Sequence, residues 1–159
     1  MLPSISVLMS VYNGANYLSQ SIESILAQTF TDFEFVIIDD CSVDETLEIL
    51  NTYSKQDSRI RIIRNPENKG LTVSLNIGLG QAQGIYVARQ DADDISLPQR
   101  FGQQIQYLET HPESVLVGSN IGIIDAEGKY LDTLQRAAPP NLVHWYLLFY
   151  NHIGGHSSV

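Results

Sequence analysis

The chain has 159 residues and a formal net charge of −9, and 43% of its residues are hydrophobic while 17% are charged. This length and composition are typical of one globular domain with a substantial core, not of a disordered chain. The acidic balance, with no run of lysine or arginine, argues against nucleic-acid binding by phosphate neutralisation. It also disfavours binding to anionic membrane surfaces.

The only cysteine is Cys41, so no internal disulfide can form and a reducing compartment fits best. The first residues, MLPSISVLMSVYNG, lack the basic region and the cleavage site of a signal peptide. The apolar run WYLLFY (145–150) is too short to span a bilayer. We therefore expect a cytoplasmic domain, which would meet the inner face of a membrane only through regions outside this chain.

Short apolar runs alternate with segments of helical periodicity along the chain. The strands are predicted over 5–11, 33–39, 59–63, 85–88 and 115–124. The helical stripes cover 18–26, 47–53, 71–82 and 101–108. This alternation predicts an α/β fold, with a mostly parallel, Rossmann-like sheet, right-handed crossovers and helices on both faces.

Two of the predicted helix starts carry a capping-box spacing, Ser42 with Glu45 and Ser96 with Gln99, the second with Pro98 in its first turn. The segment 130–134 is expected to pair with a nearby strand after a turn at Gly128. Further on, 139–150 is expected to form a helix capped by Asn141, and 156–159 to begin another strand. Because the sequence stops there, we expect a single domain that is the front part of a longer protein.

Three polar clusters follow predicted strands: SVYNG (10–14), DDCS (39–42) and QDADD (90–94). In open parallel sheets, ligands bind beyond the carboxyl ends of the strands, so we expect the three clusters to share one crevice. Each cluster alone also fits an ordinary helix cap or turn. Their joint placement at strand ends favours a binding site.

The third cluster has the sharpest chemistry, because Asp91 and Asp93 are two residues apart. In an extended segment such side chains point the same way. Two carboxylates aimed at one point repel each other unless a cation lies between them. Carboxylates suit Mg²⁺ or Mn²⁺, which usually share their coordination shell with substrate phosphates. The pattern predicts a metal-bound diphosphate, with Asp94 serving the turn into the next helix.

Three segments, in this order and spacing, resemble the family 2 glycosyltransferases: SVLMSVYNGANYLSQSIESILAQTF, FEFVIIDDCSVDET and NKGLTVSLNIGLGQAQGIYVARQDADDISLPQR. The resemblance runs from about residue 5 to 101, and NHIGGHSSV resembles a further segment more weakly. It implies a GT-A fold and a metal-dependent, inverting transfer of sugar from a UDP- or dTDP-type donor. The acceptor would be a hydroxyl of a saccharide or lipid-linked saccharide, in polysaccharide or cell-surface glycan synthesis.

The resemblance also assigns roles to residues at matching positions. Asp93 would be the principal ligand of Mn²⁺ or Mg²⁺. Asp91 would lie near the ribose or diphosphate and would be a second ligand of the same metal ion. Asp40 would accept a hydrogen bond from the base. The other nucleotide-binding residues would be Ser10, Val11, Tyr12, Asn68, Lys69 and Gly70. Three further residues could approach the phosphates or serve only structure: Arg89, Arg100 and His156.

An inverting transferase needs a base that takes the proton of the acceptor hydroxyl. In the family this base is an acidic residue of a later segment, and no matching segment occurs up to Val159. The catalytic residue is therefore unassigned. We expect this chain alone to bind a nucleotide with metal but not to transfer sugar efficiently.

Three other classes of protein deserve comparison. A receiver domain of signalling would carry acidic residues after its first strand and a lysine after its fifth, and neither is present. A nucleotidyltransferase would carry a glycine-rich loop where SVYNGAN has one glycine. A catalytically silent module that binds nucleotide sugars remains open, because no base is visible.

Overall fold

The computed structural model describes residues 2–134. The chain divides into two compact units, Met1–Gln103 and Gln104–Val159, which are treated separately below. The predicted helix over 139–150, the predicted strand at 156–159 and His156 lie outside the described residues. Among the residues described, no helix is long and apolar enough to cross a membrane.

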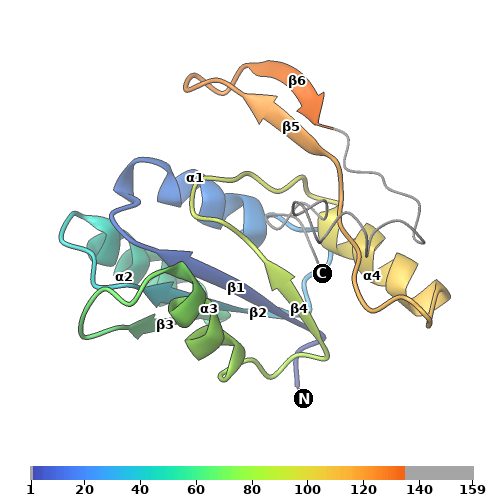
Figure 1. Cartoon of the computed structure of the whole chain (residues 1–159), viewed down its shortest axis with the longest axis horizontal. Helices are drawn as coiled ribbons and strands as arrows, with labels where there is room; N and C mark the ends of the chain where they lie inside the picture. The colour runs from blue at the N-terminus through green and yellow to red at the C-terminus, as the bar shows by residue number, and fades with distance from the viewer. Residues whose placement is uncertain (1, 135–159) are drawn as a thin grey trace. The chain divides into compact units, whose positions relative to one another are not determined.

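A four-stranded parallel sheet forms the centre of the first unit (Figure 1). Its strands lie in the order β3-β2-β1-β4. Their bounds are β1 (Ile5–Val11), β2 (Phe33–Asp39), β3 (Ile60–Arg64) and β4 (Tyr86–Arg89). Every neighbouring pair runs parallel, which confirms the predicted α/β class.

The two central strands have the bounds predicted from their apolar runs, and the two edge strands each begin one residue later than predicted. Every residue of β2 is buried, as are all but one in β1. A strand covered on both faces is a nearly continuous apolar run, so its limits are visible in the sequence even though β2 includes Glu34 and Asp39. The edge strands β3 and β4 are only partly buried, and their patterns are correspondingly weaker.

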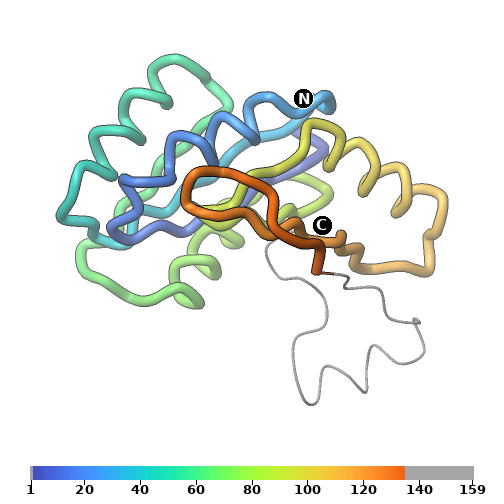
Figure 2. The backbone as a smooth tube through the Cα atoms, turned by 90° about the horizontal axis from the view of Figure 1, so that it is seen from above, coloured from blue at the N-terminus to red at the C-terminus, as the bar shows by residue number. Residues whose placement is uncertain are grey.

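Helices cover both faces of the sheet. Helices α1 (Ala15–Leu26) and α2 (Thr46–Gln56) lie on one face, and α3 (Leu71–Leu79) lies on the other (Figure 2). Right-handed crossovers require this, since the chain moves outward from β1 to β3 and then returns across the sheet to β4. On the α3 face, Leu8, Val36 and Ile38 form a buried cluster.

A glycine allows the close approach of α3 to this cluster. A Cβ built on Gly78 would lie 2.5 Å from Cδ1 of Ile38. This distance is shorter than van der Waals contact, so a larger residue would force either the Ile38 side chain or the helix to shift.

The second unit contains most of α4 (Arg100–Thr110) and a separate two-stranded sheet. Strand β5 (Ile121–Ile124) pairs antiparallel with β6 (Tyr130–Leu134) around Gly128, whose φ of 81° suits a tight turn. The predicted pairing of 130–134 is confirmed. The predicted strand over 115–124 is wrong for 115–120, where Val115 is 96% exposed.

Both predicted capping boxes are wrong, because each serine hydroxyl bonds to a distant partner. Helix α2 begins at Thr46, and Oγ of Ser42 accepts the N–H of Asn13 at 3.0 Å. Helix α4 begins at Arg100, and Oγ of Ser96 donates to Oε1 of Gln90 at 2.7 Å. Pro98 lies in the turn before the helix.

Candidate functional site

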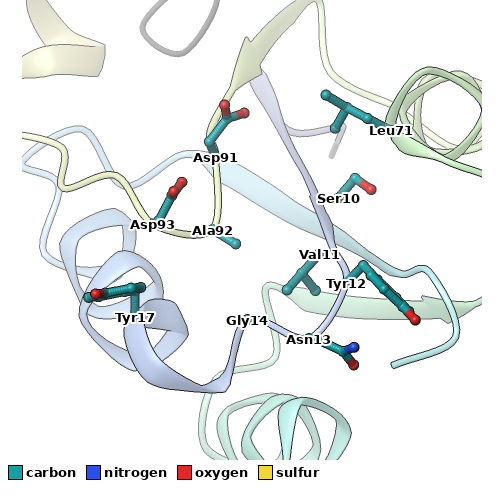
Figure 3. Close-up of a pocket in the computed structure, with 10 residues that line it drawn as sticks. All are labelled: Ser10, Val11, Tyr12, Asn13, Gly14, Tyr17, Leu71, Asp91, Ala92 and Asp93. Carbon is teal, nitrogen blue, oxygen red and sulfur yellow. The ribbon is translucent and has the colours of Figure 1, made fainter. Parts of the chain in front are cut away.

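A pocket of about 300 Å³ opens at the carboxyl ends of β1 and β4 (Figure 3). Its walls come from the loop after β1, the first turn of α1, the start of α3 and the loop after β4. The lining residues are Ser10, Val11, Tyr12, Asn13, Gly14, Tyr17, Leu71, Asp91, Ala92 and Asp93. Two of the three predicted clusters therefore meet in one pocket.

The third predicted cluster, DDCS after β2, does not line the pocket but braces the loop that does. Besides the bond between Asn13 and Ser42, the N–H of Val43 donates to Oδ1 of Asn13 at 2.9 Å. Asn13 has a φ of 52°, the left-handed region that asparagine tolerates better than most residues. The loop after β1 is thus bonded in a tight conformation to the loop after β2.

The same brace continues into the start of α1, where backbone N–H groups lack partners within the helix. The N–H of Gly14 donates to Oγ1 of Thr46 at 2.9 Å, and the N–H of Ala15 donates to Oδ2 of Asp44 at 3.2 Å. Burial raises the pKa of Asp44, but hydrogen bonds from Thr46 and Ala15 outweigh it and hold that pKa below its ordinary value. One helix is therefore capped by side chains of the next β–α connection.

Asp40 is 2% exposed, and its carboxylate bonds to the loop over 68–70. Oδ1 accepts from Nδ2 of Asn65 at 2.7 Å and from the N–H of Lys69 at 2.9 Å, and Oδ2 accepts from the N–H of Gly70 at 2.8 Å. Burial raises the pKa of Asp40, but these hydrogen bonds together with one from Ser74 bring it below its ordinary value. Asp40 thus joins β2 to the predicted nucleotide loop, and its contact with a base stays a prediction.

Asp91 and Asp93 lie on one rim of the pocket (Figure 3). The expected extended geometry is wrong: Ala92 and Asp93 form a turn, in which the N–H of Asp94 donates to the carbonyl oxygen of Asp91 at 3.3 Å. Asp91 pairs with Arg89, whose Nη2 lies 3.0 Å from Oδ1. Asp93 is exposed, and no ion pair to it occurs within residues 2–134.

Two carboxylates on one rim suit a divalent cation that a substrate helps to bind. Within residues 2–134, no group of three or more histidine, cysteine or acidic side chains could hold a metal ion. Mg²⁺ and Mn²⁺ often use only one or two protein carboxylates, together with waters and substrate phosphates. Asp91 and Asp93 fit such an ion in the company of a diphosphate, and they do not make a site from protein ligands alone.

The two arginines considered as phosphate ligands both have protein partners. Arg89 pairs with Asp91 as described, whereas Arg100 is only 8% exposed. Burial lowers the pKa of Arg100 to about 10, and the charge of Asp94 opposes this shift. The Arg100 guanidinium therefore remains charged at neutral pH and faces the protein interior. Of the two roles expected for it, phosphate contact or structural support, the structure fits structural support.

Sequence reasoning missed several residues of the site. Tyr17 and Leu71 line the pocket from the first turns of α1 and α3. The signal that could have found them is their position, since the first turn of a helix after a strand faces the carboxyl edge of the sheet. Gln90, which is 1% exposed, belongs to the cluster QDADD, but its residue type alone predicts no role there.

Known proteins resemble this chain in sequence over most of its length. It is 43% identical over 127 residues to EpsE of Bacillus subtilis, covering 79% of this chain and 46% of that protein. It is 40% identical over 126 residues to the amylovoran biosynthesis glycosyltransferase AmsE of Erwinia amylovora, covering 78% of this chain and 47% of that protein. The chain spans about half the length of these relatives.

Solved structures share the fold. The S. aureus protein TarS, residues 1–349, solved in complex with UDP, is 27% identical with a TM-score of 0.69, covering 76% of this chain and 36% of that chain. The mannosyltransferase PcManGT of Pyrobaculum calidifontis, solved with GDP-Man and Mn²⁺, is 21% identical with a TM-score of 0.69, covering 79% of this chain and 36% of that one. These neighbours are GT-A glycosyltransferases, which confirms the expected fold.

The family model of glycosyl transferase family 2 matches residues 6–157, nearly the whole chain. The match includes the loops that follow β1, β2 and β4, and with them the pocket and its two aspartates. This chain belongs to glycosyl transferase family 2.

Proposed function

We propose that this chain carries the donor site of a glycosyltransferase, whose full-length form moves a sugar from a nucleoside diphosphate to an acceptor hydroxyl. The observation that carries the proposal is the pocket at the carboxyl ends of β1 and β4, with Asp91 and Asp93 on its rim. Because the chain spans about half the length of its relatives, we assign sugar transfer to the full-length protein.

The proposed donor is a UDP- or dTDP-sugar. TarS, at 27% identity, has been solved with UDP and with UDP-GlcNAc, which supports a uracil nucleotide. Tyr12, 50% exposed at the pocket, would border the nucleoside together with Ser10 and Val11. Asp40 suits the imide N–H of uracil or thymine, and it holds the loop over 68–70 by its backbone.

The proposed metal ligands are Asp93, which is exposed and free of ion pairs within residues 2–134, and Asp91 beside it. A bound Mn²⁺ or Mg²⁺ would act there as a Lewis acid for the charge that grows on the departing diphosphate. Arg89 would hold the carboxylate of Asp91 in place until the donor arrives.

In the proposed reaction the acceptor oxygen attacks the anomeric carbon from the face opposite the diphosphate. The bond from that carbon to the diphosphate oxygen breaks, its electron pair leaves with the nucleoside diphosphate, and a base takes the acceptor proton. The configuration inverts. The base is unassigned in this chain, and we place the reaction in polysaccharide or cell-surface glycan synthesis, as the name of AmsE suggests.

Calorimetric titration of UDP, dTDP and GDP, each with and without Mn²⁺, tests the donor site. We expect UDP or dTDP to bind more tightly than GDP, and roughly tenfold or more tightly with Mn²⁺ than without it. Asp93→Asn should abolish the gain from Mn²⁺. Glu48→Gln, an exposed position in the first turn of α2, removes the same charge away from the pocket and should leave that gain unchanged.

Two results would oppose the proposal. If no nucleotide binds more tightly with Mn²⁺, the metal-dependent donor site is wrong. If the full-length protein binds donor but neither transfers nor hydrolyses it, the chain belongs instead to a catalytically silent module that binds nucleotide sugars.

A further inference from the structure

The segment from Gln90 to Gln99 carries the two pocket aspartates but contains no helix or strand. Its backbone polar groups therefore need partners from outside regular secondary structure. A loop of this kind is usually mobile, whereas binding of a metal-bound diphosphate needs carboxylates held to within about 0.5 Å. The question is which side chains hold the loop.

The amide nitrogen of Gln90 holds the aspartate turn from beneath. Nε2 of Gln90 donates to the carbonyl oxygen of Asp94 at 2.7 Å and lies 3.3 Å from that of Asp91. Oγ of Ser21, from α1, donates to the same Asp91 carbonyl at 2.8 Å. The carbonyls on either side of Asp93 are thereby fixed, while the side chains of Asp91 and Asp93 remain at the pocket rim.

The amide oxygen of Gln90 connects this turn to Arg100 at the start of α4. Oε1 accepts from Nη1 of Arg100 at 2.9 Å and from Oγ of Ser96 at 2.7 Å. Nη1 of Arg100 also donates to Oγ of Ser96 at 2.8 Å, and Nη2 donates to the carbonyl oxygen of Arg89 at 2.7 Å. Gln90 and Arg100 therefore join the two ends of the loop inside the protein.

A second set of bonds holds the far end of the loop and touches neither aspartate. Gln28, 3% exposed in the connection after α1, donates from Nε2 to the carbonyl oxygen of Leu97 at 2.8 Å. Its Oε1 accepts the N–H of Phe101 at 3.1 Å. Gln28 matches Gln90 in residue type and burial, but within the loop it bonds only to the far end and not to the turn that carries Asp91 and Asp93.

We propose that Gln90 and Arg100 are positioning residues for the donor site. They fix the backbone around Asp91 and Asp93, so that both carboxylates stand ready at the pocket rim before metal and diphosphate arrive. Neither residue touches the substrate. The inference rests on the proposed function, in which these two carboxylates hold a divalent cation with the donor's diphosphate.

The test compares Gln90→Leu with Gln28→Leu, its matched control. UDP affinity is measured by calorimetry with and without Mn²⁺, well below the unfolding midpoint of each variant, and thermal unfolding is recorded beside it. Both substitutions should lower the midpoint, because each leaves buried polar groups without partners. Only Gln90→Leu should reduce the gain in affinity from Mn²⁺, by roughly tenfold.

Arg100 provides a second pair of variants, which also serves if Gln90→Leu does not fold. Arg100→Met should reduce the gain from Mn²⁺. Arg100→Lys, which keeps a charged donor able to reach Gln90 or Ser96, should restore part of it.

Each outcome decides the proposal. If Mn²⁺ still raises the UDP affinity of folded Gln90→Leu or Arg100→Met as much as that of the unsubstituted protein, the proposal is overturned. If Gln28→Leu loses as much of this Mn²⁺-dependent affinity as Gln90→Leu does, the role of Gln90 is only to stabilise the fold. If the unsubstituted protein itself shows no gain from Mn²⁺, the proposed metal site fails and the positioning role fails with it.

Discussion

The two aspartates at the end of β2 and the two that follow β4 lie at the same edge of one sheet, yet they differ in burial. Asp39 and Asp40 are almost fully buried. Asp39 accepts the N–H of Ser42 and pairs with Arg64, whereas Asp40 accepts the N–H groups of Lys69 and Gly70. Asp91 and Asp93 lie at a pocket, one paired with a single arginine and the other exposed. The difference teaches that burial decides how much a carboxylate at a strand end contributes to the folding of the loops around it.

The largest effect on stability should come from Asp40→Ala. Removing this carboxylate takes an acceptor from the N–H of Lys69, from the N–H of Gly70 and from Nδ2 of Asn65. The Asn65 amide keeps its bond to Oγ of Ser74. We expect the free energy of unfolding to fall by about 2–4 kcal/mol. Denaturant unfolding measures this, with Asp93→Ala as the control, which should stay within about 0.5 kcal/mol of the unsubstituted protein. Equal losses in the two variants would contradict the comparison.

Asp40 should contribute to the pH dependence of stability. The folded-state pKa of Asp40 lies below 3.8, so its stabilising contribution is fully present above that pH and is lost as the pH falls through the folded-state pKa. Asp40→Asn should therefore show a shallower loss of stability below pH 3.8 than the unsubstituted protein. Acid unfolding followed by circular dichroism checks this. An unchanged slope would mean that other carboxylates, such as Asp44, dominate.

A smaller, stabilising effect is expected at Cys41, directly after Asp40. Cys41 has a φ of 66°, a conformation that glycine adopts without the clash of a Cβ. Cys41→Gly should raise the free energy of unfolding by up to about 1 kcal/mol, because relief of strain exceeds the extra entropy of the unfolded chain. Thermal unfolding under reducing conditions measures it. A fall of similar size would show that the weak contact of Sγ with the Pro66 carbonyl oxygen, 3.6 Å away, matters more.

A small effect on stability is also expected at the ion pair between Arg89 and Asp91. Arg89 and Asp91 are both partly exposed, so their pairing contributes little to folding. Arg89→Gln should change the free energy of unfolding by less than about 1 kcal/mol, yet weaken metal-free UDP binding, since Asp91 then repels the diphosphate without compensation. Titration at low and at high salt tests this, and a weakening that salt does not reduce would argue against the electrostatic cause.

The fold was predictable where burial and sequence pattern coincide. The limits of β1 and β2 could be predicted because both faces of each strand are covered. Residues 115–120 have an apolar pattern typical of a strand, but they are partly exposed and do not form one. The pocket was predictable in outline, because strand ends of a parallel sheet share an edge. The roles of Ser42 and Ser96 could not be predicted. Their hydroxyls bond to residues 29 and 6 positions away, and helix-capping rules consider only the first turn of the helix.

The capping of α1 by Thr46 and Asp44 has a consequence for the order of folding. The first N–H groups of that helix find acceptors only once the following β–α unit has docked. The start of α1, which lines the pocket, is therefore completed late, by a segment some 30 residues further along the chain. Exchange of the Gly14 and Ala15 amide protons with solvent should then report undocking of the segment that carries Asp44 and Thr46, rather than fraying of α1 itself.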